Sequence, residues 1–264
     1  MSSYLQKWTR ILFVSSLLVS FVSAIEIQNL SQAVDVAGKQ RMFTQRMLKN
    51  YAMLGLKNNF GNPGEDLTKI MGEFENHLDS LIDFNKEEAT EESLEKVKVL
   101  WGPVKLALKE PPSKEKAGKM QEDLEALLKQ SNEAVGLFAK QTGKVSGEII
   151  NISGRQRMLS QRMASLYMFK VWGIDDPQFK EKMNKAMDLF KTSLEKLMKS
   201  DMNTPEITAL LIKAKKSFMF FEIMNKSNSK FIPTLIYKKS NEILKDMNTA
   251  TGLYAALETK EKQQ

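Results

Sequence analysis

Two arginines, Arg41 and Arg157, have the residue type and the spacing to bind a small anion together. The ten residues from Gly38, GKQRMFTQRM, recur from Gly154 as GRQRMLSQRM, 116 residues further along the chain. A guanidinium group stays charged and presents its N–H donors in a planar fork that fits carboxylate, phosphate or nitrate-like oxygens. A motif written twice predicts two related units with a paired site.

Helical periodicity directs both arginines inward. At about 100° of rotation per residue, each arginine shares a helix face with small, apolar or motif residues. These are Val34, Ala37, Thr44, Gln45, Leu48 and Ala52 for Arg41, and Ile150, Ser153, Ser160, Gln161, Ala164 and Met168 for Arg157. Burying a guanidinium without an anionic partner is costly, so we expect something negative to meet each one.

Two interpretations of the pair remain open. In the first, the first helices of the two units meet at a pseudo-twofold axis, and one bound anion relieves the repulsion between the two arginines. The candidate ligand-binding residues are then Arg41, Arg157, Thr44, Gln45, Ser160 and Gln161, with Gly38, Gly154, Met42 and Met158 as supporting motif residues. In the second, each arginine has its own Asp, Glu or helix C-terminus, and the pair is structural.

The second arginine of each motif has a different environment. Arg46 falls on a polar arc with Lys39, Lys49 and Asn50. We expect Arg46 and its counterpart Arg162 to be solvated or paired with a neighbouring carboxylate.

Apolar residues recur at intervals of three and four along most of the chain, and alternating strand patterns are missing. The pattern is repeated with the motif, since Phe74, Leu78 and Leu81 match Phe190, Leu194 and Leu197 at the same offset of 116. Helices are predicted near 30–57, 65–86, 91–109 and 114–142, and again near 147–172, 177–200, 205–225 and 233–258. The predicted fold is all-α, with two tandem four-helix bundles.

Towards the end of the repeat the match returns at an offset of 109, pairing Ser131-Asn132-Glu133 with Ser240-Asn241-Glu242, which predicts a shortened loop. The connection between the bundles has two possible forms. A reversal at Gly143, a helix C-cap candidate, would set the bundles side by side, whereas one helix running from 114 to 172 would hold the motifs far apart. The glycines in this segment favour the reversal.

The N-terminus has the features of a secretory signal peptide. Lys7 and Arg10 precede an apolar run from Ile11 to Val22, which is too short to span a bilayer comfortably. We expect residues 1–24 to be removed, leaving a soluble periplasmic protein with no membrane span. The expected domains are residues 25–143 and 144–264, one copy of the repeat each.

Composition narrows the chemistry. The chain has no cysteine and one histidine, His77, which favours a surface or boundary position for that residue over a metal site. The net charge of +7 comes without a basic stripe, so nucleic acid is not an expected partner. The 16 methionines are interpreted as core residues. No nucleophile elbow, phosphate loop, paired catalytic carboxylates or Cys-His arrangement is evident, so we expect neither an enzyme nor a cofactor.

The motif also carries a family resemblance. The run from Ala37 to Met47, AGKQRMFTQRM, resembles the N-terminal sensory helix of type IV pilus chemoreceptors of the PilJ type and of NarX-like nitrate/nitrite sensor kinases. In the second copy Ser153 replaces Ala37. The resemblance implies a periplasmic four-helix bundle in which the motif arginines, here Arg41 and Arg157, hold one anion at an interface. The Gly-Lys-Gln-Arg and Gly-Arg-Gln-Arg sequences look closer to the pilus chemoreceptor branch.

Sensors of this kind carry transmembrane helices and a signalling region, which this sequence does not show. The expected function is therefore an exported tandem sensor module that binds a small inorganic oxyanion, nitrate-like or nitrite-like, and passes its state to a membrane receptor or sensor kinase. The alternative is a ligand-free interaction protein that docks on a pilus-associated or chemosensory complex.

Overall fold

The structure is a computed structural model that describes residues 25–143, 145–226 and 232–261, so the predicted signal peptide lies outside the described residues. Within those ranges it has eight α-helices and no strand. They are α1 (Leu30–Gly55), α2 (Pro63–Phe84), α3 (Glu88–Lys109), α4 (Lys114–Gln141), α5 (Val145–Trp172), α6 (Phe179–Met198), α7 (Pro205–Lys226) and α8 (Pro233–Glu261). The predicted all-α fold is confirmed.

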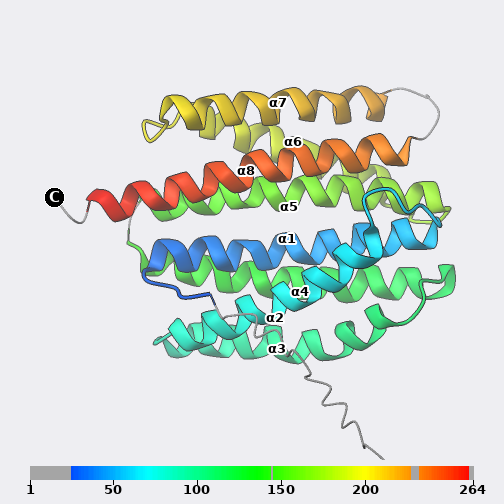
Figure 1. The fold of residues 1–264 in the computed structure, drawn as a ribbon, viewed down its shortest axis with the longest axis horizontal. Coiled ribbons are helices and arrows are strands. Elements are labelled where there is room, and N and C mark those ends of the chain that lie inside the picture. Colours follow the sequence, from blue (N-terminus) through cyan, green and yellow to red (C-terminus); the bar gives the residue numbers. More distant parts are fainter. Residues whose placement is uncertain (1–24, 144, 227–231, 262–264) are drawn as a thin grey trace, which may run out of the picture.

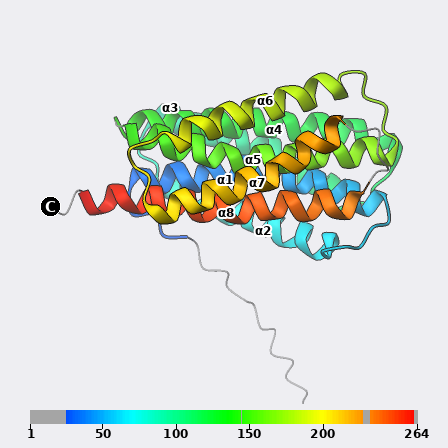
Figure 2. The same ribbon diagram turned by 90° about the horizontal axis from the view of Figure 1, so that it is seen from above.

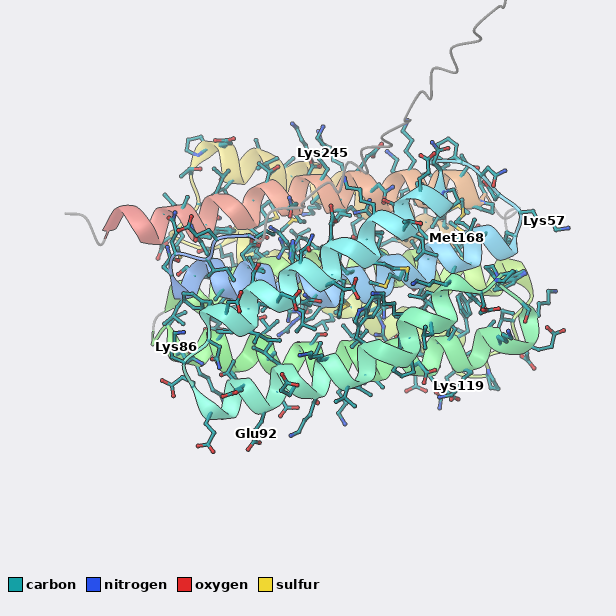
Figure 3. The ribbon with its side chains drawn as sticks, turned by 60° about the horizontal axis from the view of Figure 1, so that its bottom comes forward. Lys57, Lys86, Glu92, Lys119, Met168 and Lys245 are labelled. Carbon is teal, nitrogen blue, oxygen red and sulfur yellow. The ribbon has the colours of Figure 1, made fainter. Side chains whose placement is uncertain are left out.

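The helices form two groups of four, α1–α4 and α5–α8, which we call the first and second bundles (Figure 1). In each bundle the first helix packs against the second and the fourth, and the third packs against the fourth. Helices α1 and α5 lie at the centre and pack along each other. Figures 1 and 2 show that most helices run close to the long axis, whereas α2 crosses its bundle obliquely. Charged side chains such as Lys57, Glu92 and Lys119 project from the outside of the molecule (Figure 3).

The chain reverses between the bundles, as the glycine-containing segment favours. Gly143 has φ 62°, the left-handed conformation that commonly ends a helix, and α5 begins at Val145. Helices α1 and α5 then run parallel with equivalent positions side by side. Near their ends, the rings of Tyr51 and Trp172 are 5.9 Å apart. The alternative of one continuous helix is excluded.

The repeat offset between α4 and α8 is 116, not 109. Buried residues of α4 correspond to buried residues of α8 at this offset, for example Ala134 with Ala250 and Phe138 with Tyr254. The predicted shortened loop is therefore wrong. A shift of seven residues is about two helical turns and keeps the same face, so the pairing of Ser131 with Ser240 matched the face but not the level along the helix.

Several helix starts differ from their predictions by two or three residues; α3, for example, begins at Glu88 rather than near 91. Helix α6 begins at Phe179 rather than near 177, because the Asp176 carboxylate accepts a hydrogen bond from the backbone N–H of Gln178 in a turn before the helix. At α7 the predicted cap is present, since the Thr204 hydroxyl oxygen accepts from the backbone N–H of Ile207. In the part of the chain that is described, no helix has the length and apolar character needed to cross a membrane.

Candidate functional site

Arg41 and Arg157 are both buried where α1 packs against α5, with 1% and 0% of their surface exposed. Every residue predicted to share their helix faces is buried too. Two positions without side chains give the guanidinium groups their room. A Cβ atom on Gly38 would lie 3.1 Å from Nη2 of Arg157 and 3.5 Å from Nη2 of Arg41, and one on Gly154 would lie 3.0 and 3.5 Å from the same atoms. The two guanidinium groups therefore converge between the two glycines.

Arg41 has only neutral hydrogen-bond acceptors. Its Nη1 donates to the amide oxygen of Asn132 on α4 at 2.9 Å, and its Nη2 donates to the backbone carbonyl of Asn151 on α5 at 3.2 Å. No carboxylate among the described residues forms an ion pair with it. Burial, with the positive charges of Arg155 and Arg157, lowers the pKa of Arg41 to about 9, so it is a cation at neutral pH without a neutralising partner.

Arg157 has a carboxylate partner. Its Nη1 donates to the Asp35 carboxylate at 2.7 Å and to the amide oxygen of Asn248 on α8 at 3.0 Å, and its Nη2 donates to the backbone carbonyl of Asp35 at 3.1 Å. Asp35 also pairs with Lys39 at 3.1 Å. Burial alone would raise the pKa of Asp35, but the charges of Arg157 and Lys39 outweigh burial and hold that pKa below its ordinary value.

Each arginine also keeps one buried donor without a partner. The Nε atoms of Arg41 and Arg157 have no hydrogen bond, and neither does the buried side-chain oxygen of Asn151. Buried polar atoms of this kind are destabilising when they stay unsatisfied. The seam between α1 and α5 therefore combines surplus positive charge with unused hydrogen-bonding groups.

The four polar residues expected to assist the arginines have protein partners of their own. Thr44 and Ser160 donate to the backbone carbonyls of Arg41 and Arg157 at 2.9 and 2.7 Å. Gln45 donates to Glu125 at 3.2 Å, and Gln161 donates to the carbonyl of Ser240 at 3.0 Å. Their side-chain donors have acceptors within the protein, whereas the Nε donors of the two arginines do not.

The prediction for the second motif arginines is confirmed. Arg46 pairs with Asp66 on α2, its Nε lying 3.0 Å from the carboxylate. Arg162 pairs with Glu125 on α4 at 2.8 Å. Each is partly exposed and neutralised.

Lys49 is a buried cation that the sequence interpretation missed. The predicted polar arc placed it with Arg46, yet Lys49 and Asn50 are fully buried. Its ammonium group donates to the side-chain oxygens of Gln161 and Asn241 at 2.6 and 2.7 Å and lies 4.1 Å from the ring centre of Tyr237. Burial, followed by the nearby charge of Arg46, lowers the pKa of Lys49 well below its ordinary value. The sequence signal for Lys49 was weak: it lies two residues after the repeated motif, and the equivalent residue of the second copy is Ser165.

His77 was expected at the surface or boundary and is in fact buried, with 6% of its surface exposed. Its ring packs edge-on against Phe43 at 5.1 Å, and its Nδ1 has no hydrogen-bond partner. Burial, with the charge of Lys39, lowers the pKa of His77 to about 4, so the imidazole is neutral at neutral pH. No group of three or more His, Asp or Glu side chains in the described ranges is placed to hold a metal ion.

The motif methionines Met42 and Met158 are buried, as predicted for core residues, whereas Met219 on α7 is half exposed. The interpretation of the methionines as core residues is therefore wrong for Met219.

The chain matches a model of a known protein family over more than half of its length. A protein-family model described as the type IV pili methyl-accepting chemotaxis transducer N-terminal region matches residues 26–132 and 138–215. The two matched segments cover most of the first bundle and the first part of the second. No curated protein and no solved structure matches the chain.

Proposed function

The chain belongs to the family of type IV pili methyl-accepting chemotaxis transducer N-terminal domains, of the PilJ type, and we propose that it is a periplasmic sensor module that binds a small oxyanion. Residues 25–143 and 144–264 would be its two copies, and residues 1–24 the export signal. The ligand would be nitrate-like or nitrite-like, as in the NarX-like sensors that the motif resembles. A membrane receptor or sensor kinase would receive the signal.

One observation carries the proposal: Arg41 is a fully buried cation whose acceptors are all neutral, and it lies beside a second buried arginine. An uncompensated buried charge destabilises a fold by several kcal/mol. A bound anion would remove that penalty, and it would accept hydrogen bonds that the protein leaves unmade at the guanidinium Nε atoms. The planar fork of arginine suits an anion with two or three coplanar oxygens.

The position of the site suits a sensor. Arg41 is on α1 and Arg157 on α5, and these helices form the main contact between the bundles. A ligand held by Arg41 beside Asn151 would strengthen the contact between α1 and α5, and without it the charge of Arg41 has no neutralising partner at this contact. Such a ligand shifts the balance between two packing arrangements only to the extent that it binds them differently.

A thermal-shift panel on the purified protein tests the proposal. Nitrate, nitrite, sulfate, phosphate and small carboxylates are compared with chloride at matched ionic strength, because a ligand that binds only the folded state raises its melting temperature. At least one oxyanion should raise the melting temperature of the wild type, and Arg41→Met should remove the effect.

Arg46→Met is the matched control, since it removes an arginine of the same motif that already has its carboxylate. It should keep the response. A flat panel for the wild type would refute oxyanion binding and favour a ligand-free protein that docks on a pilus or chemosensory complex.

A further inference from the structure

The two halves of the arginine site are not equivalent, and we infer that the chain binds a single monovalent, carboxylate-shaped anion at Arg41. This inference rests on the proposed function. Asp35 acts as a built-in anion for Arg157, and Asn151 at the equivalent position leaves the Arg41 half unoccupied. Asp35 and Asn151 are therefore the residues that set the stoichiometry and the ligand class.

The hydrogen bonds of the two arginines are equivalent except for the side chains at positions 35 and 151. Each Nη1 donates to an asparagine of the fourth helix of its own bundle, Asn132 or Asn248, and these are 116 residues apart. Each Nη2 donates to the backbone carbonyl of residue 151 or 35 in the other bundle, again 116 residues apart. The carboxylate of Asp35 adds one further contact to Arg157 that has no counterpart at Arg41.

The surrounding charges differ in the same way. In the Arg157 half, Lys39 lies one helical turn after Asp35 on α1 and pairs with its carboxylate. Beside Arg41, the equivalent residue is Arg155, whose charge acts on Arg41 and for which no ion pair with a described carboxylate is present. The Arg157 half thus has two cations and one carboxylate, and the Arg41 half has two cations and none.

The Arg41 half lacks a counterpart of the Asp35 carboxylate, and this indicates the class of ligand that would fit it. One negative charge on a planar group with two or three oxygens would give the Arg41 half the balance that Asp35 gives to the other half. Nitrate, nitrite and formate have this form. Sulfate and hydrogen phosphate are tetrahedral and carry more charge, so they match the Asp35 group less well.

An exposed residue lies next to the buried Arg41. Asn132, which accepts from its Nη1, is an exposed residue on α4, although Arg41 itself is buried. An anion would reach that donor only after the Asn132 side chain has turned away from it. An anion oxygen would then take the place of the amide oxygen of Asn132.

Two reciprocal substitutions test the inference, with melting temperature and calorimetric titration of nitrate as readouts. Asn151→Asp places a carboxylate at the Arg41 half, so it should raise the melting temperature in chloride buffer and abolish the nitrate-induced shift. Asp35→Asn should lower the melting temperature in chloride buffer and raise the number of nitrate ions bound per chain from one to two. Asn59→Asp makes the same charge change at an exposed position and should leave nitrate binding unchanged.

The outcomes separate this inference from the proposed function. If no anion on the panel stabilises the wild type, the proposed function fails and this inference fails with it. If nitrate, nitrite or formate stabilises the wild type and Asn151→Asp equally, or if the wild type binds two ions per chain, oxyanion binding stands and the single half-site is refuted. A response to sulfate alone would refute the carboxylate-shaped ligand.

Discussion

Arg41 and Arg157 are the same residue type at equivalent positions, yet their surroundings give them different energetic roles. Arg157 is one partner of a buried ion pair with Asp35, whereas Arg41 bonds to neutral oxygens only. Removing one partner of a buried pair is strongly destabilising, because the other charge stays buried. Arg41 has no counter-charge, so its removal also removes the energetic cost of burying an uncompensated cation.

We therefore predict that Arg157→Met lowers the free energy of unfolding by about 3 kcal/mol. Arg41→Met should lower it by about 1 kcal/mol or less, because relief of the uncompensated charge offsets the loss of the hydrogen bonds to Asn132 and Asn151. Urea unfolding of both variants in chloride buffer measures this difference. Equal losses for the two variants would show that Arg41 also has an effective counter-charge.

Lys49 should make the stability of the protein depend on pH. Burial lowers its pKa in the folded state below the ordinary 10.5, so between those two values the unfolded chain binds more protons than the folded protein. The free energy of unfolding should therefore rise with pH through this window, as the folded lysine loses its proton more readily. Lys49→Met should remove that rise, and urea unfolding from pH 6 to pH 9.5 checks it. Parallel curves for the variant and the wild type would contradict the assignment.

His77 contributes a similar dependence at acid pH. Its pKa of about 4 lies below the ordinary 6.5, so its contribution to stability is complete above about 6.5 and is lost as the pH falls towards 4. His77→Phe should make the melting temperature less sensitive to pH over this range. A variant that loses stability with acid as steeply as the wild type would contradict a neutral buried imidazole.

At the scale of elements, the close approach of α1 and α5 depends on Gly38 and Gly154. A methyl group at either position would meet a guanidinium Nη2 at 3.1 or 3.0 Å, which is tighter than ordinary packing. Gly38→Ala and Gly154→Ala should each lower the free energy of unfolding by about 1–3 kcal/mol, the usual range for overpacking.

Gly136 in α4 is the matched control, because a Cβ there would meet nothing within 4 Å. Gly136→Ala should stabilise the protein by about 0.5–1 kcal/mol through helix propensity alone. Thermal or urea unfolding of the three variants gives the comparison. Stabilisation in all three would mean that the seam does not need its glycines.

The elements themselves could be predicted from the sequence, because periodicity and caps are local signals. Phe74 and Phe190 are buried as their spacing indicates, and α7 begins at the predicted Pro205. The level of α8 relative to α4 could not be predicted, since a shift of two turns preserves the pattern of buried residues. Arg41 was placed on the correct face, but its partner Asn132 lies 91 residues away on another helix.

In the complete molecule, the packing of one bundle against the other determines which polar residues are buried and which residues contact the arginines. The sequence of one bundle alone does not contain this information. The side-chain contacts of Lys49 all lie in the second bundle, whereas Asn50 donates to Asp66 on α2 of its own bundle. Helix α8 of the second bundle covers Lys49 through Tyr237 and Asn241, so a residue that looks solvated along the sequence is buried. Likewise, the difference between Asp35 and Asn151 affects the charge balance of the arginines only because each residue contacts the arginine of the other bundle.

The same arrangement makes ligand binding a property of both bundles together. The most direct test is a pair of crystal structures of the protein, one grown with sodium nitrate and one with sodium chloride. In the nitrate crystal we expect one planar anion per chain at the α1–α5 seam, within hydrogen-bonding reach of the Arg41 guanidinium group and close to Asn151. Nitrate bound only at surface lysines, with the seam the same in both crystals, would contradict the proposed site.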